Sequence, residues 1–167
     1  LVKEGAKVYV TDIYTEKALK VAAETGAEYV ASEKITTLDC DIFSPNALGA
    51  ILNDETIPNL KCAVVAGGAN NQLEDEKKHA DALRKRGIIY APDYVINAGG
   101  LMNVASEIDG YSKTRVLKQA EGIYTILSTI FKTASDRNIL SIEASNAIAE
   151  ERIAAILEPK YKNMQVW

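Results

Sequence analysis

The stretch KCAVVAGGANNQLEDEKKHADALRKRGIIYAP, residues 61–92, decides the fold expected for this chain. It opens with an apolar strand that runs into a Gly-Gly-Ala-Asn-Asn turn, together spanning residues 61–71. A helix is predicted at 74–87, because acidic residues stand at its start, basic residues at its end and Gly87 follows as a stop. A second apolar strand is predicted at 88–92. Strand, helix and strand in this order predict parallel strands in an α/β sheet.

The same alternation extends outward from this stretch in both directions. Further strands are predicted at 6–12, 27–31 and 40–45, with a helix at 15–26 whose Ala18, Leu19 and Ala22 face inward. Val8, Tyr9 and Val10 are nearly continuous apolar residues, which predicts a strand buried on both faces. After residue 100 the pattern is helical, with helices at about 101–109, 113–136 and 141–158 and a frayed tail. We expect one α/β domain over residues 1–167: a Rossmann-like, doubly wound parallel sheet followed by C-terminal helices.

The bulk composition is that of a soluble globular protein. The chain has 167 residues, a formal net charge of −4 and 47% apolar residues. It offers no basic surface for a nucleic acid. No apolar run approaches the roughly 18–20 residues of a membrane span, and no signal peptide is recognisable. We therefore expect neither nucleic acid nor membrane as a partner.

Cysteine and histidine usage bounds the compartment and the metal chemistry. Cys40 and Cys62 lie in apolar, strand-like runs, and two buried thiols favour a reducing compartment, so we expect a cytoplasmic location. With one histidine and no CxxC motif, no metal site is expected. His79 stands beside Lys77 and Lys78 in its predicted helix and is expected to lie on the solvated surface.

Ligands of open parallel sheets bind beyond the carboxyl ends of the strands, and Asp12 and Ile13 follow the first strand. An acid at this place in a dinucleotide-binding fold accepts ribose hydroxyls and repels a 2′-phosphate, which favours NAD over NADP. Alternatively, Asp12 caps the helix at 15–26. The Gly-rich turn expected about 20 residues before such an acid would precede Leu1. We therefore expect a piece of a longer protein that lacks the first strand and helix unit.

Three later loops carry further candidates. Small residues around Ala47 are able to lie against a flat ring, or form an ordinary turn. Asn70 and Asn71 supply amides that suit a ribose or a nicotinamide, or one of them caps the next helix. Asn97 follows the last strand and is placed to meet a ligand amide.

A Gly-Gly break after Asn97 opens an apolar helical stripe. Leu101, Val104, Ala105 and Ile108 are spaced to share one helix face. The stripe is either plain core or one wall of a binding site. The sequence pairs no nucleophile with a general base, so the chain is not expected to activate a substrate by itself.

Taken together, these loops resemble the NAD-binding domain of the glutamate/leucine/phenylalanine/valine dehydrogenase family, and its leucine-type members most closely. The resemblance covers residues 5 to about 155, and the combination of APDYVINAGG with ANNQL is highly specific. The segments that carry it are GAKVYVTDI (5–13), CDIFSPNALGAILNDETIP (40–58), VVAGGANNQLEDE (64–76), GIIYAPDYVINAGGLMNV (87–104) and AEERI (149–153).

The resemblance implies oxidative deamination of an L-amino acid to a 2-oxo acid and ammonia, with NAD as the cofactor. The family's catalytic Lys and Asp lie in another, N-terminal domain, so none of the present residues is expected to be catalytic and the chain alone is expected to be inactive. The resemblance also implies a homo-oligomer. The alternative is a catalytically inactive nucleotide-binding or regulatory module.

Residue roles follow from the resemblance position by position. Val104 replaces a Ser that holds the side-chain carboxylate in glutamate-specific relatives, so the substrate is expected to be leucine, valine or isoleucine, with an aromatic amino acid left open. Asn46 and Ala50 depart from the family's usual Cys and Gly. The matched positions are Asp12, beside Ile13, for the adenosine ribose; Ala47 for the nicotinamide ribose; Asn70, Asn71 and Asn97 for the nicotinamide end; and Leu101 and Val104 for the substrate side chain.

Overall fold

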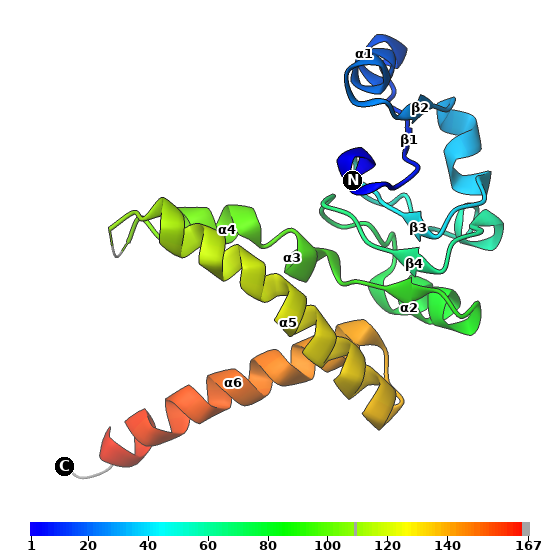
Figure 1. Ribbon diagram of the computed structural model, residues 1–167. Coiled ribbons are helices and arrows are strands. Elements are labelled where there is room, and N and C mark those ends of the chain that lie inside the picture. Colours follow the sequence, from blue (N-terminus) through cyan, green and yellow to red (C-terminus); the bar gives the residue numbers. More distant parts are fainter. Residues whose placement is uncertain (109, 165–167) are drawn as a thin grey trace.

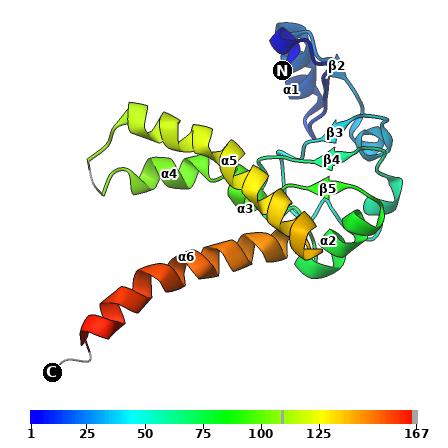
Figure 2. The same ribbon diagram turned by 60° about the horizontal axis from the view of Figure 1, so that its bottom comes forward.

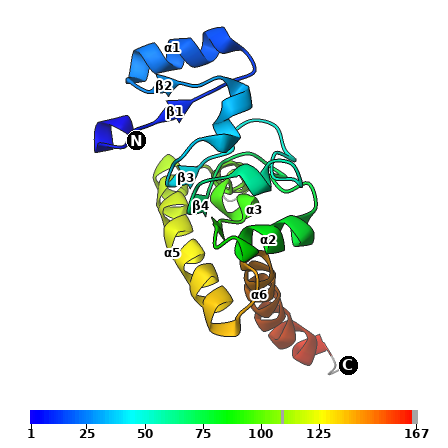
Figure 3. The same ribbon diagram turned by 90° about the vertical axis from the view of Figure 1, so that its right-hand side faces the viewer.

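The computed structural model describes residues 1–108 and 110–164, and the side chains of 1–108 and 110–157 (Figure 1). Three parts follow one another along the chain. A small unit of two strands and one helix lies at the N-terminus, a three-stranded sheet with its helix forms the body, and helices extend from that body. Figure 3 shows the first unit standing apart from the body.

The first unit is a parallel strand pair joined by a helix. After the 3-10 turn η1 (Val2–Glu4), β1 (Tyr9–Val10) and β2 (Glu28–Tyr29) pair in parallel, with α1 (Thr15–Thr25) between them. The backbone N–H of Glu28 donates to the Val8 carbonyl at 2.8 Å. The chain leaves α1 through Gly26, whose φ of 79° suits glycine.

The body is built on the parallel sheet β3-β4-β5 (Figure 2). Its strands are β3 (Ile42–Phe43), β4 (Val64–Val65) and β5 (Ile89–Tyr90), in a register that aligns Phe43, Val65 and Tyr90. The 3-10 turns η2 (Ser32–Thr37) and η3 (Ile57–Asn59) precede β3 and β4, and α2 (Glu76–Lys85) joins β4 to β5. Buried apolar side chains from the sheet, the β3–β4 connection with η3, α2 and the start of α6 form one core: Phe43, Leu52, Ile57, Leu60, Cys62, Val65, Ala80, Leu83, Ile88, Tyr90, Leu140 and Ile142.

The remaining helices extend away from the sheet. They are α3 (Asp93–Ile96), α4 (Gly99–Ala105), α5 (Lys113–Arg137) and α6 (Ser141–Met164). The helix α4 packs against α5, and α5 packs against α6. The chain reverses at Asn138, whose φ is 52°, and α6 then runs outward to the C-terminal end (Figure 1). The Ser141 hydroxyl donates to the Tyr90 carbonyl at 2.7 Å, which fixes the start of α6 to the end of β5.

The predicted α/β class with parallel strands is confirmed, but the strands form two sheets instead of one. A doubly wound sheet of order 3-2-1-4-5-6 would place one more strand between β1 and β3. In the part of the chain that the structure describes, no strand takes that place. Because β1 has one strand neighbour and one covering helix, Val8, Tyr9 and Val10 are half-buried, and the expectation of burial on both faces is wrong.

The observed helix boundaries differ from the predicted ones by a few residues. The helix predicted at 101–109 is α4, which begins at Gly99 and ends at Ala105; residue 109 lies outside the described residues. The expected frayed tail is helical as far as Met164, beyond which residues 165–167 are not described. Leu19, expected to face inward from α1, is 49% exposed, whereas Ala18 is buried.

His79 is buried, with 2% of its surface exposed, so its expected place on the solvated surface is wrong. Its charged sequence neighbours lie on the outer face of α2, while His79 and Leu83, four residues apart, share the inner face. The His79 Nδ1 accepts the Asp75 backbone N–H at 2.9 Å, and its Nε2 lies 3.2 Å from Asp54 Oδ1. Because Nδ1 is an acceptor, Nε2 carries the hydrogen and donates a hydrogen bond to Asp54 Oδ1.

The two cysteines are free thiols, Cys62 buried and Cys40 half-buried. Burial raises the pKa of each thiol above its usual value. None of the described helices combines the length and apolar character needed to cross a membrane.

Replacing His79 by Ala is expected to lower the free energy of unfolding by about 2–4 kcal/mol, because the buried imidazole is lost, a cavity opens beneath α2 and the Asp75 N–H loses its acceptor. Urea unfolding followed by circular dichroism measures this. The control is Lys78→Ala, which removes the other partner of Asp54. That pair is exposed, at 58% and 65% of its two side chains, so its loss is expected to leave the free energy of unfolding nearly unchanged. Equal losses in the two variants would contradict the role assigned to the buried imidazole.

Candidate functional site

The loops after β3 and β4 lie side by side because the two strands are parallel and in register. The Ala69 N–H donates to the Pro45 carbonyl at 3.0 Å. A Cβ added to Gly67 would lie 2.0 Å from that same carbonyl oxygen. Glycine at position 67 is therefore what allows the two loops to approach this closely.

Asn46 fastens the same two loops through its side chain. Its Oδ1 accepts the Gly68 N–H at 2.9 Å, and its Nδ2 donates to the Ser44 carbonyl and hydroxyl at 3.0 and 2.9 Å. The departure from the family's Cys therefore has a structural role here. Ala47, the next residue, is exposed at the surface of the joined loops.

The structure brings together two amides that the sequence places in separate loops. The Asn97 Nδ2 donates to the Asn70 Oδ1, which joins the loop after β4 to the end of α3. Asn70 is exposed and Asn97 is half-buried, so the pair lies at the surface of the site. Within the described residues, the Asn70 amino group and the Asn97 carbonyl make no further hydrogen bond. The pair thus presents one donor and one acceptor side by side.

Asn71 does not join this pair. Its φ is 52°, and its backbone carbonyl accepts the Ala50 N–H at 2.7 Å. The same alignment continues where the Leu52 N–H donates to the Gln72 carbonyl at 2.9 Å. Asn71 therefore shapes the loop through its backbone, while its side chain lines a neighbouring hollow.

Two buried polar residues of the site were missed at the level of sequence. Gln72 is fully buried, and its Nε2 donates to the carbonyls of Gly67 and Ala69 at 2.6 and 2.9 Å. Its backbone N–H donates to Asp93 Oδ2 at 3.0 Å, although Asp93 lies 21 residues further along the chain. Only the polar character of both residues beside apolar strands was visible in the sequence, which does not reveal burial or partners.

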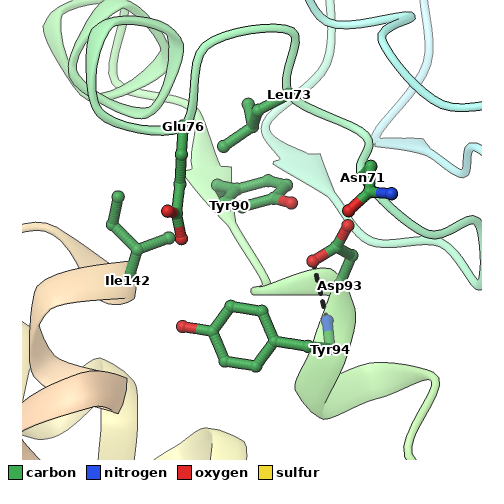
Figure 4. Close-up of a pocket in the computed structure, with 7 residues that line it drawn as sticks. All are labelled: Asn71, Leu73, Glu76, Tyr90, Asp93, Tyr94 and Ile142. Atoms are coloured by element: carbon green, nitrogen blue, oxygen red, sulfur yellow. Dashed lines mark hydrogen bonds between the residues drawn. The ribbon is translucent and has the colours of Figure 1, made fainter.

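A hollow of about 180 Å³ adjoins these residues, between the start of α2, the end of β5, α3 and the start of α6 (Figure 4). Burial raises the pKa of Tyr90 and of Tyr94, so both phenols stay neutral. Carboxylates and neutral phenols therefore face this space together. It is lined by Asn71, Leu73, Glu76, Tyr90, Asp93, Tyr94 and Ile142.

Asp12 and Ile13 follow β1 and so belong to the other sheet (Figure 1). Asp12 is half-buried, and its Oδ1 accepts the Tyr14 N–H at 2.8 Å. The N-cap of α1 is Tyr14 and no side chain caps the helix, so the capping alternative for Asp12 is wrong. Ile13 is 74% exposed.

The apolar stripe on α4 is open to solvent. Leu101 is 75% exposed and Val104 is 62% exposed, so the alternative that they are plain core is wrong. Ile108, further along, is also exposed. Because α4 packs against α5, these side chains lie on surface that α5 leaves uncovered. An apolar wall thus follows directly after Asn97.

The described residues contain no cluster of three or more His, Cys, Asp or Glu side chains suited to a metal ion.

Comparisons with known proteins place this geometry in a family. Residues 3–159 match the family model described as Glutamate/Leucine/Phenylalanine/Valine dehydrogenase. The chain is 55% identical over 150 residues to leucine dehydrogenase of Thermoactinomyces intermedius, covering 90% of this chain and 41% of that protein. It is 46% identical over 163 residues to leucine dehydrogenase of Geobacillus stearothermophilus, covering 98% and 44%.

A solved structure shows the same similarity in three dimensions. The crystal structure of L-tryptophan dehydrogenase from Nostoc punctiforme matches with a TM-score of 0.87 at 46% identity, covering 89% of this chain and 45% of that chain. The chain spans less than half the length of these relatives. The family match over nearly the whole chain and the shared fold show that it belongs to the glutamate/leucine/phenylalanine/valine dehydrogenase family.

Proposed function

We propose that this chain supplies the NAD-binding part of an L-amino-acid dehydrogenase that oxidatively deaminates leucine or another apolar amino acid. The observation that carries this proposal is the Asn70–Asn97 amide pair beside the exposed apolar wall of Leu101 and Val104. A nicotinamide carboxamide has one carbonyl acceptor and one amino donor. The open amino group of Asn70 and the open carbonyl of Asn97 complement these two groups.

The adenosine end of the cofactor is assigned to Asp12. One of its carboxylate oxygens holds the Tyr14 N–H, which leaves the other to accept ribose hydroxyls. A 2′-phosphate beside this carboxylate would meet like charge, so NAD is proposed over NADP. Ile13 and Ala47 are exposed beside the ribose positions proposed for them.

The substrate side chain is assigned to the wall of Leu101 and Val104. Neither residue donates a hydrogen bond from its side chain, so a substrate carboxylate placed there would lose water without gaining a partner. The relatives named leucine and L-tryptophan dehydrogenase support an apolar substrate class. We propose leucine or another branched-chain amino acid first.

The chemistry divides between this chain and the rest of the enzyme. When bound, NAD would accept the hydride from the substrate Cα, and water would hydrolyse the resulting imine to the 2-oxo acid and ammonia. The residues described here bind and orient the nicotinamide and shape the substrate pocket. The proton-transferring Lys and Asp implied by the family have no counterpart among them, so catalysis requires those groups from elsewhere.

Two further properties are proposed on lesser grounds. The family resemblance supports a homo-oligomer. The two free thiols, held as thiols in and beside the core, favour a reducing, cytoplasmic location.

Substrate preference tests the assignment of Val104. The protein expressed from its complete coding sequence is expected to reduce NAD faster with L-leucine than with L-glutamate. Val104→Ser should lower kcat/KM for leucine roughly tenfold, because apolar contact is lost in the pocket. Val21→Ser, at a half-exposed valine of α1, is the matched control and should leave kcat/KM unchanged. A preference for glutamate would refute the assignment, and failure to reduce NAD with any amino acid would favour a noncatalytic nucleotide-binding module.

Cofactor choice tests the assignment of Asp12. Asp12→Asn keeps an oxygen for the Tyr14 N–H but removes the charge. The ratio of kcat/KM for NAD to that for NADP is expected to fall at least about tenfold, since a charged hydrogen bond and a repulsion are both lost. Glu24→Gln, an exposed acid on α1, is the control. An unchanged ratio in Asp12→Asn would rule out this role for the carboxylate.

A further inference from the structure

We propose that Asp93 and Gln72 are positioning residues that hold the Asn70–Asn97 amide pair in the arrangement that the nicotinamide requires. The inference rests on the function proposed above for that pair. Neither residue contacts the proposed nicotinamide directly, since Gln72 is fully buried and Asp93, 9% exposed, borders the neighbouring hollow. They act through the loops that carry the two asparagines.

The hydrogen bonds form a closed ring through both loops. The Asp93 carboxylate accepts the Gln72 N–H at 3.0 Å, and two residues earlier in the chain Asn70 accepts from the Asn97 amide. The Asn97 backbone N–H then donates to the Asp93 carbonyl at 2.9 Å, which closes the ring. One residue, Asp93, thus fixes the loop of Asn70 through its side chain and Asn97 through its backbone.

The burial of Asp93 shows that its position is held by specific bonds. Its second carboxylate oxygen accepts the Tyr94 N–H at 2.7 Å (Figure 4). Among the described residues no Lys, Arg or His forms an ion pair with it, so backbone N–H groups alone offset its desolvation. Burying a carboxylate costs desolvation energy, which these hydrogen bonds have to offset. Its bonds serve the two site loops, which gives a reason for its presence.

The buried Gln72 side chain supports the loop after β4, which carries Asn70. Its two donated hydrogen bonds hold the carbonyls of Gly67 and Ala69, on the segment that leads directly into Asn70. A methionine at this position would fill the space without donating either bond. Among the described residues the buried Gln72 Oε1 has no hydrogen-bond partner, so the hydrogen bonds of this side chain come from its amino group alone. The Gln72 side chain thus satisfies two carbonyl groups of the loop, while its own carbonyl group stays unsatisfied within the described part of the chain.

The two ends of the proposed cofactor site make this inference testable. Asp12 lies on the β1–β2 unit, whereas Asp93 and Gln72 lie in the body of the protein. Loss of positioning at the amide pair should therefore weaken contacts to the nicotinamide and spare those to the adenosine. A defect in overall folding would weaken both.

The experiment measures dissociation constants for NADH and for ADP-ribose, which lacks the nicotinamide, on the protein expressed from its complete coding sequence. For Asp93→Asn and for Gln72→Met, the constant for NADH is expected to rise about tenfold or more, and that for ADP-ribose to stay within about twofold. Leu83→Val alters a fully buried core residue of α2 outside the ring and is the control for stability. It should change neither constant.

Unchanged NADH binding in both variants would overturn the inference. Equal weakening of NADH and ADP-ribose would also overturn it, because a general structural role predicts that result. The two variants remove different bonds of the ring, so selective loss of NADH affinity in either folded variant supports the inference even where the other does not fold. If the unmodified protein binds neither probe, the function proposed above fails and this inference falls with it.

Discussion

The in-register parallel pairing of β3, β4 and β5 is the constraint on which the rest of the structure depends. It places Phe43, Val65 and Tyr90 in one row, so the loops that follow the three strands all leave the sheet at the same edge. Polar groups far apart in sequence then become neighbours, as the contact between Asn70 and Asn97 shows. The pairing is supported from beneath by the core that the sheet shares with α2 and the start of α6.

Close approach is the second requirement of the site. The loops after β3 and β4 touch because Gly67 has no Cβ, and Asn46, held by two hydrogen bonds to Ser44 in its own loop, joins the loops by accepting the Gly68 N–H. The buried Gln72 side chain donates a hydrogen bond to the Gly67 carbonyl of the loop after β4, and Asp93 of α3 accepts the Gln72 N–H. Rigid support of this kind lets exposed amides hold a fixed direction without being buried themselves. The site is therefore a surface feature whose precision comes from buried polar groups.

Sequence reasoning reached the class of fold and the residues at the strand ends, because apolar runs, helix dipole charges and glycine stops are local signals. It failed where tertiary contacts decide. The charged neighbours of His79 concealed a buried imidazole, and the spacing of Leu101 and Val104 did not distinguish a core from the wall of a binding site. Gln72 and Asp93 left no local signal, since a buried polar side chain is recognised by partners that lie elsewhere in the chain.

The separation of the β1–β2 unit from the body bears on the energetics of ligand binding. A dinucleotide held by Asp12 at one end and by the amide pair at the other would lie across the division between the sheets. A ligand bound at both ends removes whatever freedom the two units have relative to each other. The loss of that freedom is subtracted from the affinity, so a ligand that bridges the division binds less tightly than its contacts alone would give. A structural element that already held the two sheets together would reduce this entropic cost, and the same ligand would bind more tightly.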